Sequence, residues 1–310
     1  MRNVFEPRGW RVVRFRGPDR APRVGAVDPK APATIVELAS PDPLDAIRLG
    51  GLAERASAAT RSIETLDPET LALPPPWELL EPLVAVETWA AGVTYERSRQ
   101  ARVAETQVED VYSRVYGAER PELFLKDAAG RRTVGPGATV GVRADSHWTV
   151  PEPELALVLG EQGALLGATI GNDLTARDIE GENPLYLPQA KLFAGACAIG
   201  PAIVVPDDWG EPFAIEIRIV DASGDSVYEG LTSTDRMKRT PEELVYYLGR
   251  DNPVPAGTLL LTGTGLVPPD DVALAPGHSV EIRIAGIGML RNPVGSAAEL
   301  IERKDLLHVG

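Results

Sequence analysis

The chain is poor in the residues that carry several common kinds of chemistry. Its 310 residues include one cysteine, Cys197, and three histidines. A single cysteine forms no intramolecular disulfide and no cysteine cluster for zinc or iron–sulfur. The histidines, His147, His278 and His308, show no spacing typical of metal ligands. A Gly-x-Ser-x-Gly elbow, a Walker loop and a dinucleotide-binding glycine motif are also missing, which removes the commonest rival enzyme classes.

Basic clusters and long apolar runs are missing as well. The formal net charge is −14 and no block of lysine or arginine occurs, so nucleic acid is not an expected partner. No run approaches the roughly 18 apolar residues of a membrane span, so no membrane partner is expected. The N-terminal segment 1–17 is rich in arginine and has no apolar core of signal-peptide length. We therefore expect a cytoplasmic protein.

The order of strand-like and helix-like segments predicts an α+β, β-rich protein in two parts. A proline cluster at 74–76 interrupts any regular element, so residues 1–82 are expected to form a small N-terminal α+β domain and residues 83–310 the larger one. Two-residue alternation at 215–220 and 280–284 is typical of half-exposed antiparallel sheet. Helices are few, and are expected at 95–108 and 241–250. This pattern favours a β-rich roll or sandwich over a doubly wound sheet.

Two acidic residues lie two positions apart before an apolar run. On a strand, Glu152 and Glu154 share one face while the leucines at 155, 157 and 159 face the other way. Like charges this close need a counter-charge, which a divalent cation supplies. Oxygen ligands without nearby histidine or cysteine suit Mg²⁺, Mn²⁺ or Ca²⁺. An isolated Glu-x-Glu more often marks a solvated strand face, so the interpretation needs further residues.

Further charged residues follow in the segments after this pair. Asp173, Arg177 and Asp178 come directly after a strand that ends in a glycine, and Lys191 lies in an apolar context. A lone ammonium beside a carboxylate–metal cluster can stabilise an enolate or transfer a proton. A salt bridge from Lys191 to Asp178 or Glu180 is an equally good interpretation. The turn at 261–265 can hold a substrate carboxylate, although a plain tight turn is the commoner meaning.

These residues resemble the motifs of the fumarylacetoacetate hydrolase superfamily over residues 89–294. The motifs occur in the family's order, at 91–95, 121–126, 152–154, 173–178, 191, 261–265 and 286–293. The resemblance implies a mixed β-sandwich roll, after the smaller N-terminal domain, in a homodimer or homotetramer. It also implies Mg²⁺, or Mn²⁺ or Ca²⁺, on Glu152, Glu154 and Asp173, with Lys191 as the active-site lysine and Thr264 as a substrate-binding threonine.

One departure from the hydrolase pattern bears on mechanism. The family's hydrolases carry a histidine in the segment after Gly-x-x-Tyr, whereas this position is Ser98 in Gly92-Val-Thr-Tyr-Glu-Arg-Ser98. Hydrolysis of a C–C bond needs a base for its water, and serine does not supply one. The segments 92–98, 120–124 and 179–189 are instead similar to the family's 2-keto-3-deoxy-pentonate dehydratase branch. That similarity implies loss of water from a sugar acid to give a 2-oxoglutarate semialdehyde.

The resemblance yields a set of expected site residues around a small 2-oxo acid substrate. Glu122 is the expected general base, Glu122 or Glu105 the expected proton donor to the leaving hydroxyl, and Lys191 the support of the enolate. The expected substrate-binding residues are Tyr95, Ser98, Arg177, Asp178, Gln189 and Thr264. Two alternatives stay open. One is a metal-dependent hydrolase of an acylpyruvate or a 2,4-dioxo sugar acid, and the other is a protein that binds a metal and a 2-oxo acid without turnover.

Overall fold

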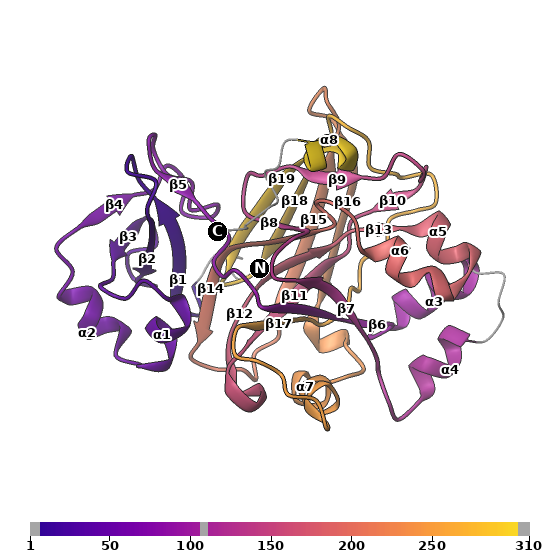
Figure 1. Ribbon diagram of the computed structural model, residues 1–310, viewed down its shortest axis with the longest axis horizontal. Helices are drawn as coiled ribbons and strands as arrows, with labels where there is room; N and C mark the ends of the chain where they lie inside the picture. Colours follow the sequence, from indigo (N-terminus) through magenta and orange to yellow (C-terminus); the bar gives the residue numbers. More distant parts are fainter. Residues whose placement is uncertain (1–6, 106–110, 303–310) are drawn as a thin grey trace.

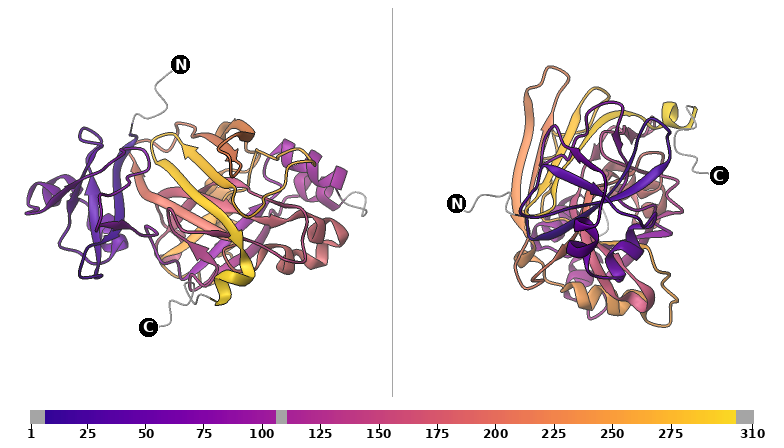
Figure 2. Two further views of the ribbon diagram at one scale, coloured as in Figure 1. Left: turned by 90° about the horizontal axis from the view of Figure 1, so that it is seen from above. Right: turned by 90° about the vertical axis from the view of Figure 1, so that its left-hand side faces the viewer.

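The N-terminal part of the chain is built on four antiparallel strands in the order β4-β3-β2-β1. The computed structural model describes residues 7–105 and 111–302, with no side chains described at 102, 104 and 105. The strands are β1 (Gly9–Arg16), β2 (Pro22–Val27), β3 (Thr34–Glu37) and β4 (Ser62–Glu64). A short strand and two short helices accompany them: β5 (Glu78–Leu79), α1 (Pro43–Arg48) and α2 (Leu52–Ser57). This part lies at one end of the molecule (Figures 1 and 2).

One continuous sheet runs from this part into the rest of the chain. Gly9–Val12 of β1 pair antiparallel with residues 203–206 of β14 (Cys197–Pro206). Beyond β14 the order is β12-β11-β17-β6-β7, and β8 (Thr133–Val134) pairs with β14 at the side. These strands are β12 (Leu165–Asp173), β11 (Pro153–Leu159), β17 (Thr258–Leu261), β6 (Glu87–Gly92) and β7 (Glu122–Ala128). The expected boundary at residue 82 lies in the loop between β5 and β6, and the division into two domains stays a prediction.

A second, five-stranded sheet packs on the first and completes the sandwich. Its order is β16-β15-β18-β19-β9. Leucines 155, 157 and 159 of β11 share one apolar core with alternate residues of β15 and β18, as the two-residue period predicts. The strands are β16 (Ser226–Ser233), β15 (Ala214–Val220), β18 (Ser279–Ile284), β19 (Gly288–Ser296) and β9 (Val140–Val142), and a separate pair is β10 (Thr149–Val150) with β13 (Thr175–Ala176). The predicted β-rich α+β sandwich is confirmed.

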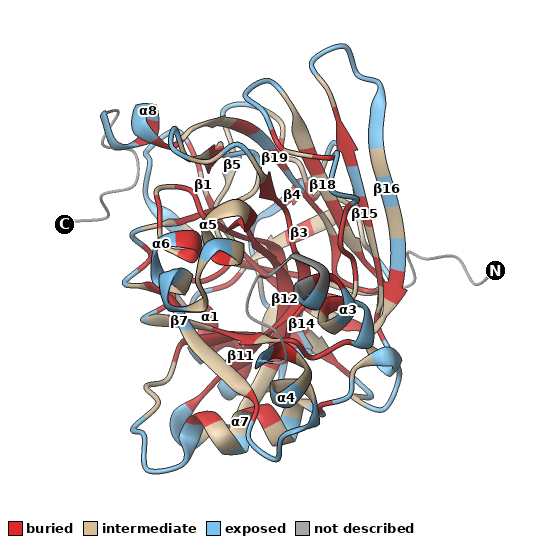
Figure 3. Ribbon diagram, turned by 90° about the vertical axis from the view of Figure 1, so that its right-hand side faces the viewer, coloured by how far each residue is buried: buried red, intermediate tan, exposed pale blue. Residues whose placement is uncertain are grey.

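Four helices gather at the end of the molecule far from the N-terminal part (Figure 1). They are α3 (Glu96–Glu105), α4 (Val111–Gly117), α5 (Arg177–Glu182) and α6 (Leu187–Lys191). Seen from this end, buried segments of β11, β12 and β14 lie behind these partly exposed helices (Figure 3). The other helical segments are α7 (Pro241–Gly249), α8 (Ala297–Glu302), η1 (Glu161–Gly163), η2 (Pro184–Tyr186) and η3 (Thr234–Arg236). None of the helices described is long and apolar enough to cross a bilayer.

Candidate metal and substrate site

Strand pairing brings the three predicted carboxylate ligands together. Glu154 of β11 pairs with Gly171 of β12, so the start of β11 lies beside the end of β12, where Asp173 stands. Glu152, Glu154 and Asp173 each offer an oxygen, and these oxygens lie within 4.8 Å of one another. All three side chains are buried. The three side chains offer only carboxylate oxygens as ligands, and such ligands fit the hard cations Mg²⁺, Mn²⁺ and Ca²⁺.

Buried cations surround two of these carboxylates. Lys191 Nζ lies 2.9 Å from Glu152 Oε2 and 2.8 Å from Asp173 Oδ2. Arg177 Nη2 lies 3.0 Å from Glu152 Oε1, which also accepts a hydrogen bond of 2.9 Å from the Thr175 hydroxyl. Both of these Lys191 contacts are with carboxylates of the predicted metal cluster. Its ammonium belongs to the carboxylate cluster.

Glu154 is the least compensated of the three. Its Oε2 accepts a hydrogen bond of 2.6 Å from the Gly263 amide. Complete burial, followed by the charges of Asp173 and Glu152, raises the pKa of Glu154 well above its ordinary value. A divalent cation would remove this penalty. Asp173 Oδ1 is buried and accepts no hydrogen bond of normal geometry within the described part of the chain, and its charged neighbour is the ammonium of Lys126 at 2.6 Å.

A small pocket opens beside the carboxylates and is lined by residues from six segments of the chain. The predicted residues that line it are Ser98, Glu122, Glu152, Asp173, Arg177, Lys191 and Thr264. The Ser98 hydroxyl donates a short hydrogen bond to the carbonyl oxygen of Thr264, which joins α3 to the turn after β17. Ser98 of helix α3 therefore lines the pocket, and its contact with the substrate stays a prediction.

Glu122 reaches the pocket because the residue opposite it is a glycine. Gly92 at the end of β6 pairs directly with Glu122 at the start of β7. A Cβ on Gly92 would overlap the Glu122 carboxylate. The motif Gly-x-x-Tyr thus supplies the space that the predicted base occupies.

Tyr95 is buried next to the pocket and does not line it. Its hydroxyl has no hydrogen-bond partner among the described residues. Burial and then the charge of Glu154 raise the pKa of this phenol, so it stays protonated. Tyr95 can therefore donate a hydrogen bond but cannot act as a base at neutral pH.

Two predicted substrate contacts lie elsewhere. Asp178 accepts hydrogen bonds from the Ser146 hydroxyl (2.7 Å) and the His147 amide (2.8 Å), so it holds the loop before β10. Gln189 is exposed on α6. Residues one or two positions apart on a helix point in different directions. Asp178 therefore faces away from the pocket that Arg177 lines, and Gln189 faces away from the pocket that Lys191 lines. The predicted proton donor Glu105 has a side chain outside the described residues.

The sequence interpretation missed three residues near the carboxylates. Glu180 and Phe124 line the pocket, and Lys126 Nζ lies 2.6 Å from Asp173 Oδ1 behind it. Each could have been found from periodicity. Phe124 and Lys126 follow Glu122 at two-residue intervals on a strand, and Glu180 follows Arg177 by three on a helix, which places it on the same face.

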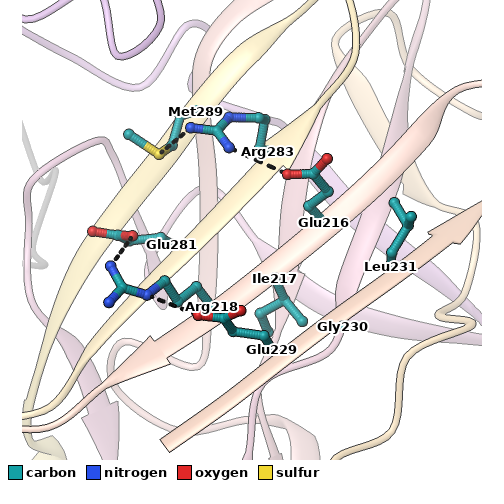
Figure 4. A pocket seen from close by; sticks show the side chains of 9 residues that line it. All are labelled: Glu216, Ile217, Arg218, Glu229, Gly230, Leu231, Glu281, Arg283 and Met289. Carbon is teal, nitrogen blue, oxygen red and sulfur yellow. Dashed lines mark hydrogen bonds and ion pairs between the residues drawn. The ribbon is translucent and has the colours of Figure 1, made fainter. Parts of the chain in front are cut away.

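A larger hollow on the outer face of the second sheet has a different character (Figure 4). Its charges pair across strands, with Arg218 3.2 Å from Glu229 and Arg283 3.2 Å from Glu216. None of the predicted site residues lines it. Alternating, solvent-exposed pairs of this kind are typical of a wetted sheet face. We therefore place the chemistry at the smaller pocket.

Comparison with known proteins shows the family of the chain. Residues 89–295 match the sequence model of the family "Fumarylacetoacetate (FAA) hydrolase C-terminal". A protein of Haloferax volcanii named "probable 2-keto-3-deoxyxylonate dehydratase" is 44% identical over 273 residues, which cover 84% of this chain and 92% of that protein. The "2-dehydro-3-deoxy-D-arabinonate dehydratase" of Saccharolobus solfataricus is 46% identical over 221 residues, or 70% of this chain and 74% of that one.

A solved structure extends the similarity to the whole fold. A 2-keto-3-deoxy-D-arabinonate dehydratase complexed with magnesium and 2,5-dioxopentanoate aligns with a TM-score of 0.80 and 38% sequence identity. The alignment covers 92% of this chain and 99% of that one. The structural similarity therefore extends beyond residues 89–295, which the family model matches.

Proposed function

Because the chain belongs to the fumarylacetoacetate hydrolase family, we propose that it is a metal-dependent dehydratase of a 2-keto-3-deoxy pentonate. The observation that carries the proposal is the buried cluster of Glu152, Glu154 and Asp173 beside a pocket that also holds Lys191 and Glu122. The two dehydratases that cover most of this chain, at 44% and 46% identity, give the substrate class. The product would be a 2-oxoglutarate semialdehyde.

The carboxylate cluster would hold Mg²⁺, with Mn²⁺ or Ca²⁺ as alternatives. When bound there, such an ion supplies a Lewis acid that makes the C3 protons of a 2-oxo acid more acidic. The solved relative contains magnesium, in agreement with the oxygen-only ligands of this chain.

The remaining steps fall to the side chains of the pocket. Glu122 takes a proton from C3, and the electron pair moves towards the keto oxygen, where the positive charge of Lys191 opposes the new negative charge. The C–O bond at C4 then breaks, and Glu122 returns its proton to the leaving hydroxyl, so that water departs. Proton shifts alone convert the remaining unsaturated acid to the semialdehyde. Thr264 and Arg177 would bind the substrate carboxylate.

The hydrolase alternative lacks, in the described pocket, the histidine that the family's hydrolases carry. Hydrolysis requires a group that deprotonates water, and no histidine lines the pocket in the part of the chain that the structure describes. His147 is exposed on the loop before β10, and Ser98 donates its proton to a carbonyl oxygen. The homodimer or homotetramer, the cytoplasmic location and the lack of nucleic-acid partners stay predictions from the sequence.

Product analysis by NMR tests the proposed function. Purified protein with Mg²⁺ should convert a 2-keto-3-deoxy pentonate to a semialdehyde and leave every C–C bond intact. An acylpyruvate offered in parallel should remain unchanged. Cleavage of the acylpyruvate to pyruvate and a free acid, with the sugar acid untouched, would establish the hydrolase instead. Exchange of solvent deuterium into C3 of a bound 2-oxo acid would count against a protein that binds a metal and a 2-oxo acid without turnover.

A further inference from the structure

We propose that Lys126, which does not line the pocket, is a positioning residue that sets both the charge and the geometry of the metal site. The kinetic part of this inference rests on the proposed function. The metal-binding part does not, because it follows from the carboxylate cluster alone.

Lys126 ties together three segments that form the site. Its side chain is fully buried on β7. The ammonium donates hydrogen bonds of 2.8 Å to the carbonyl oxygen of Leu174 and 2.7 Å to that of Lys191. It also lies 2.6 Å from Asp173 Oδ1. One side chain thereby fixes the end of β12, the end of α6 and the carboxylate of a metal ligand.

The two lysines at Asp173 contact different oxygens of its carboxylate. Lys191 contacts Oδ2 and lines the pocket, whereas Lys126 contacts Oδ1 from behind and reaches no substrate. Lys126 Nζ donates two of its three N–H groups to backbone carbonyl oxygens. It therefore cannot change partners during a reaction without releasing the backbone of Leu174 and Lys191. We therefore assign the contact with the substrate to Lys191, and to Lys126 the role of holding Asp173 and the nearby backbone in place.

The positive charge of Lys126 also repels the divalent cation that the site would hold and so weakens its binding. Lys126, Lys191 and Arg177 set three positive charges against three carboxylates in a buried region where Coulomb interactions are weakly screened. Removing one fixed positive charge makes the cluster more negative, so a divalent cation should bind more tightly. Removing the two hydrogen bonds from Lys126 Nζ loosens Asp173 and Lys191, so turnover should fall. A purely structural lysine would weaken both properties together.

Calorimetric titration with Mg²⁺ and steady-state kinetics on Lys126→Met test this opposition. At pH 8 we expect a Mg²⁺ dissociation constant on the order of tenfold lower than in the wild type. We expect kcat to fall on the order of a hundredfold, the usual cost of misplacing reacting groups by about 1 Å. Lys30→Met, at an exposed lysine of the N-terminal part, is the matched control and should change neither value.

A second variant separates the charge from the hydrogen bonds. Lys126→Gln removes the charge and retains an NH2 group, one bond nearer the backbone, that can donate to the carbonyl oxygens of Leu174 and Lys191. It should bind Mg²⁺ as tightly as Lys126→Met and retain more of the wild-type kcat. Unchanged or weaker Mg²⁺ binding in a folded variant would overturn the proposal, as would failure of both variants to fold. Tighter binding in a protein that does not dehydrate the sugar acid would support the metal-binding part and refute the proposed function instead.

Discussion

At the scale of single residues, Glu154 links metal binding to stability. Its pKa is raised in the folded chain, whereas the unfolded chain releases the same proton near the ordinary value of about 4.3. Without metal, the folded state therefore loses stability relative to the unfolded state as the pH rises through the interval between these two values. Below the ordinary value the effect is absent.

Glu154→Gln should therefore raise the melting temperature in EDTA at pH 7 to 8, and the gain should shrink as the pH falls towards 4. Glutamine keeps an oxygen for the Gly263 amide and carries no buried charge. The same variant should bind Mg²⁺ at least about tenfold more weakly, because one of three charged ligands is lost. Thermal melts across pH with EDTA or Mg²⁺ check both effects. An equal gain in melting temperature at pH 4 and pH 8 would speak against the raised pKa.

Ser98 and Lys191 should differ strongly in their cost to catalysis. The Ser98 hydroxyl makes one hydrogen bond to the Thr264 carbonyl, so Ser98→Ala should cost roughly 1 kcal/mol, or under about tenfold in kcat. Lys191→Met should cost far more, since it removes the charge that opposes the enolate. Initial rates on a 2-keto-3-deoxy pentonate check the contrast. A loss of several hundredfold in Ser98→Ala would instead assign the serine to the chemistry.

At the scale of elements, the pairing of β6 with β7 sets the position of the base. A methyl group at position 92 would push the Glu122 carboxylate away, so Gly92→Ala should lower kcat about as far as Glu122→Gln does. The double variant should be no worse than either single one, since both remove the same function. Gly117→Ala on α4, where a Cβ meets nothing within 4 Å, is the control and should keep wild-type activity. Additive losses in the double variant would separate Gly92 from Glu122.

The elements also show where prediction from the sequence stops. Strand alternation predicts that Glu152 and Glu154 lie on one face and the leucines of β11 on the opposite face, because a two-residue period fixes the face of a strand. The structure has this arrangement. On a helix, membership of a motif does not by itself show which residues face the pocket. Arg177 and Asp178 are adjacent in one motif, yet only Arg177 faces the pocket. Glu180 lines the same pocket although it lies outside the motif at 173–178.

At the scale of the whole molecule, the N-terminal part is joined to the sandwich more closely than a linker predicts. The sheet is continuous across β1 and β14, and the buried Arg11 donates hydrogen bonds to the carbonyl oxygens of Pro68 and Ile287, one on each side of the seam. Long-range pairing of this kind depends on residues more than 190 positions apart, as between Trp10 and Val205. No local pattern in the sequence reveals such a pairing, whereas the proline cluster at 74–76 is a local signal and predicts a boundary.

This continuity predicts that the chain unfolds as a single unit. We expect one calorimetric transition that includes residues 1–82, because separating the two parts would expose the β14 edge and break the hydrogen bond from the guanidinium of Arg11 to the Ile287 carbonyl oxygen. A chain that begins at Leu83 should be insoluble or poorly folded for the same reason. Arg11→Met should lower the melting temperature while the transition stays single. Two separated transitions, or a soluble and active chain without residues 1–82, would show instead that the boundary at residue 82 divides two independent domains.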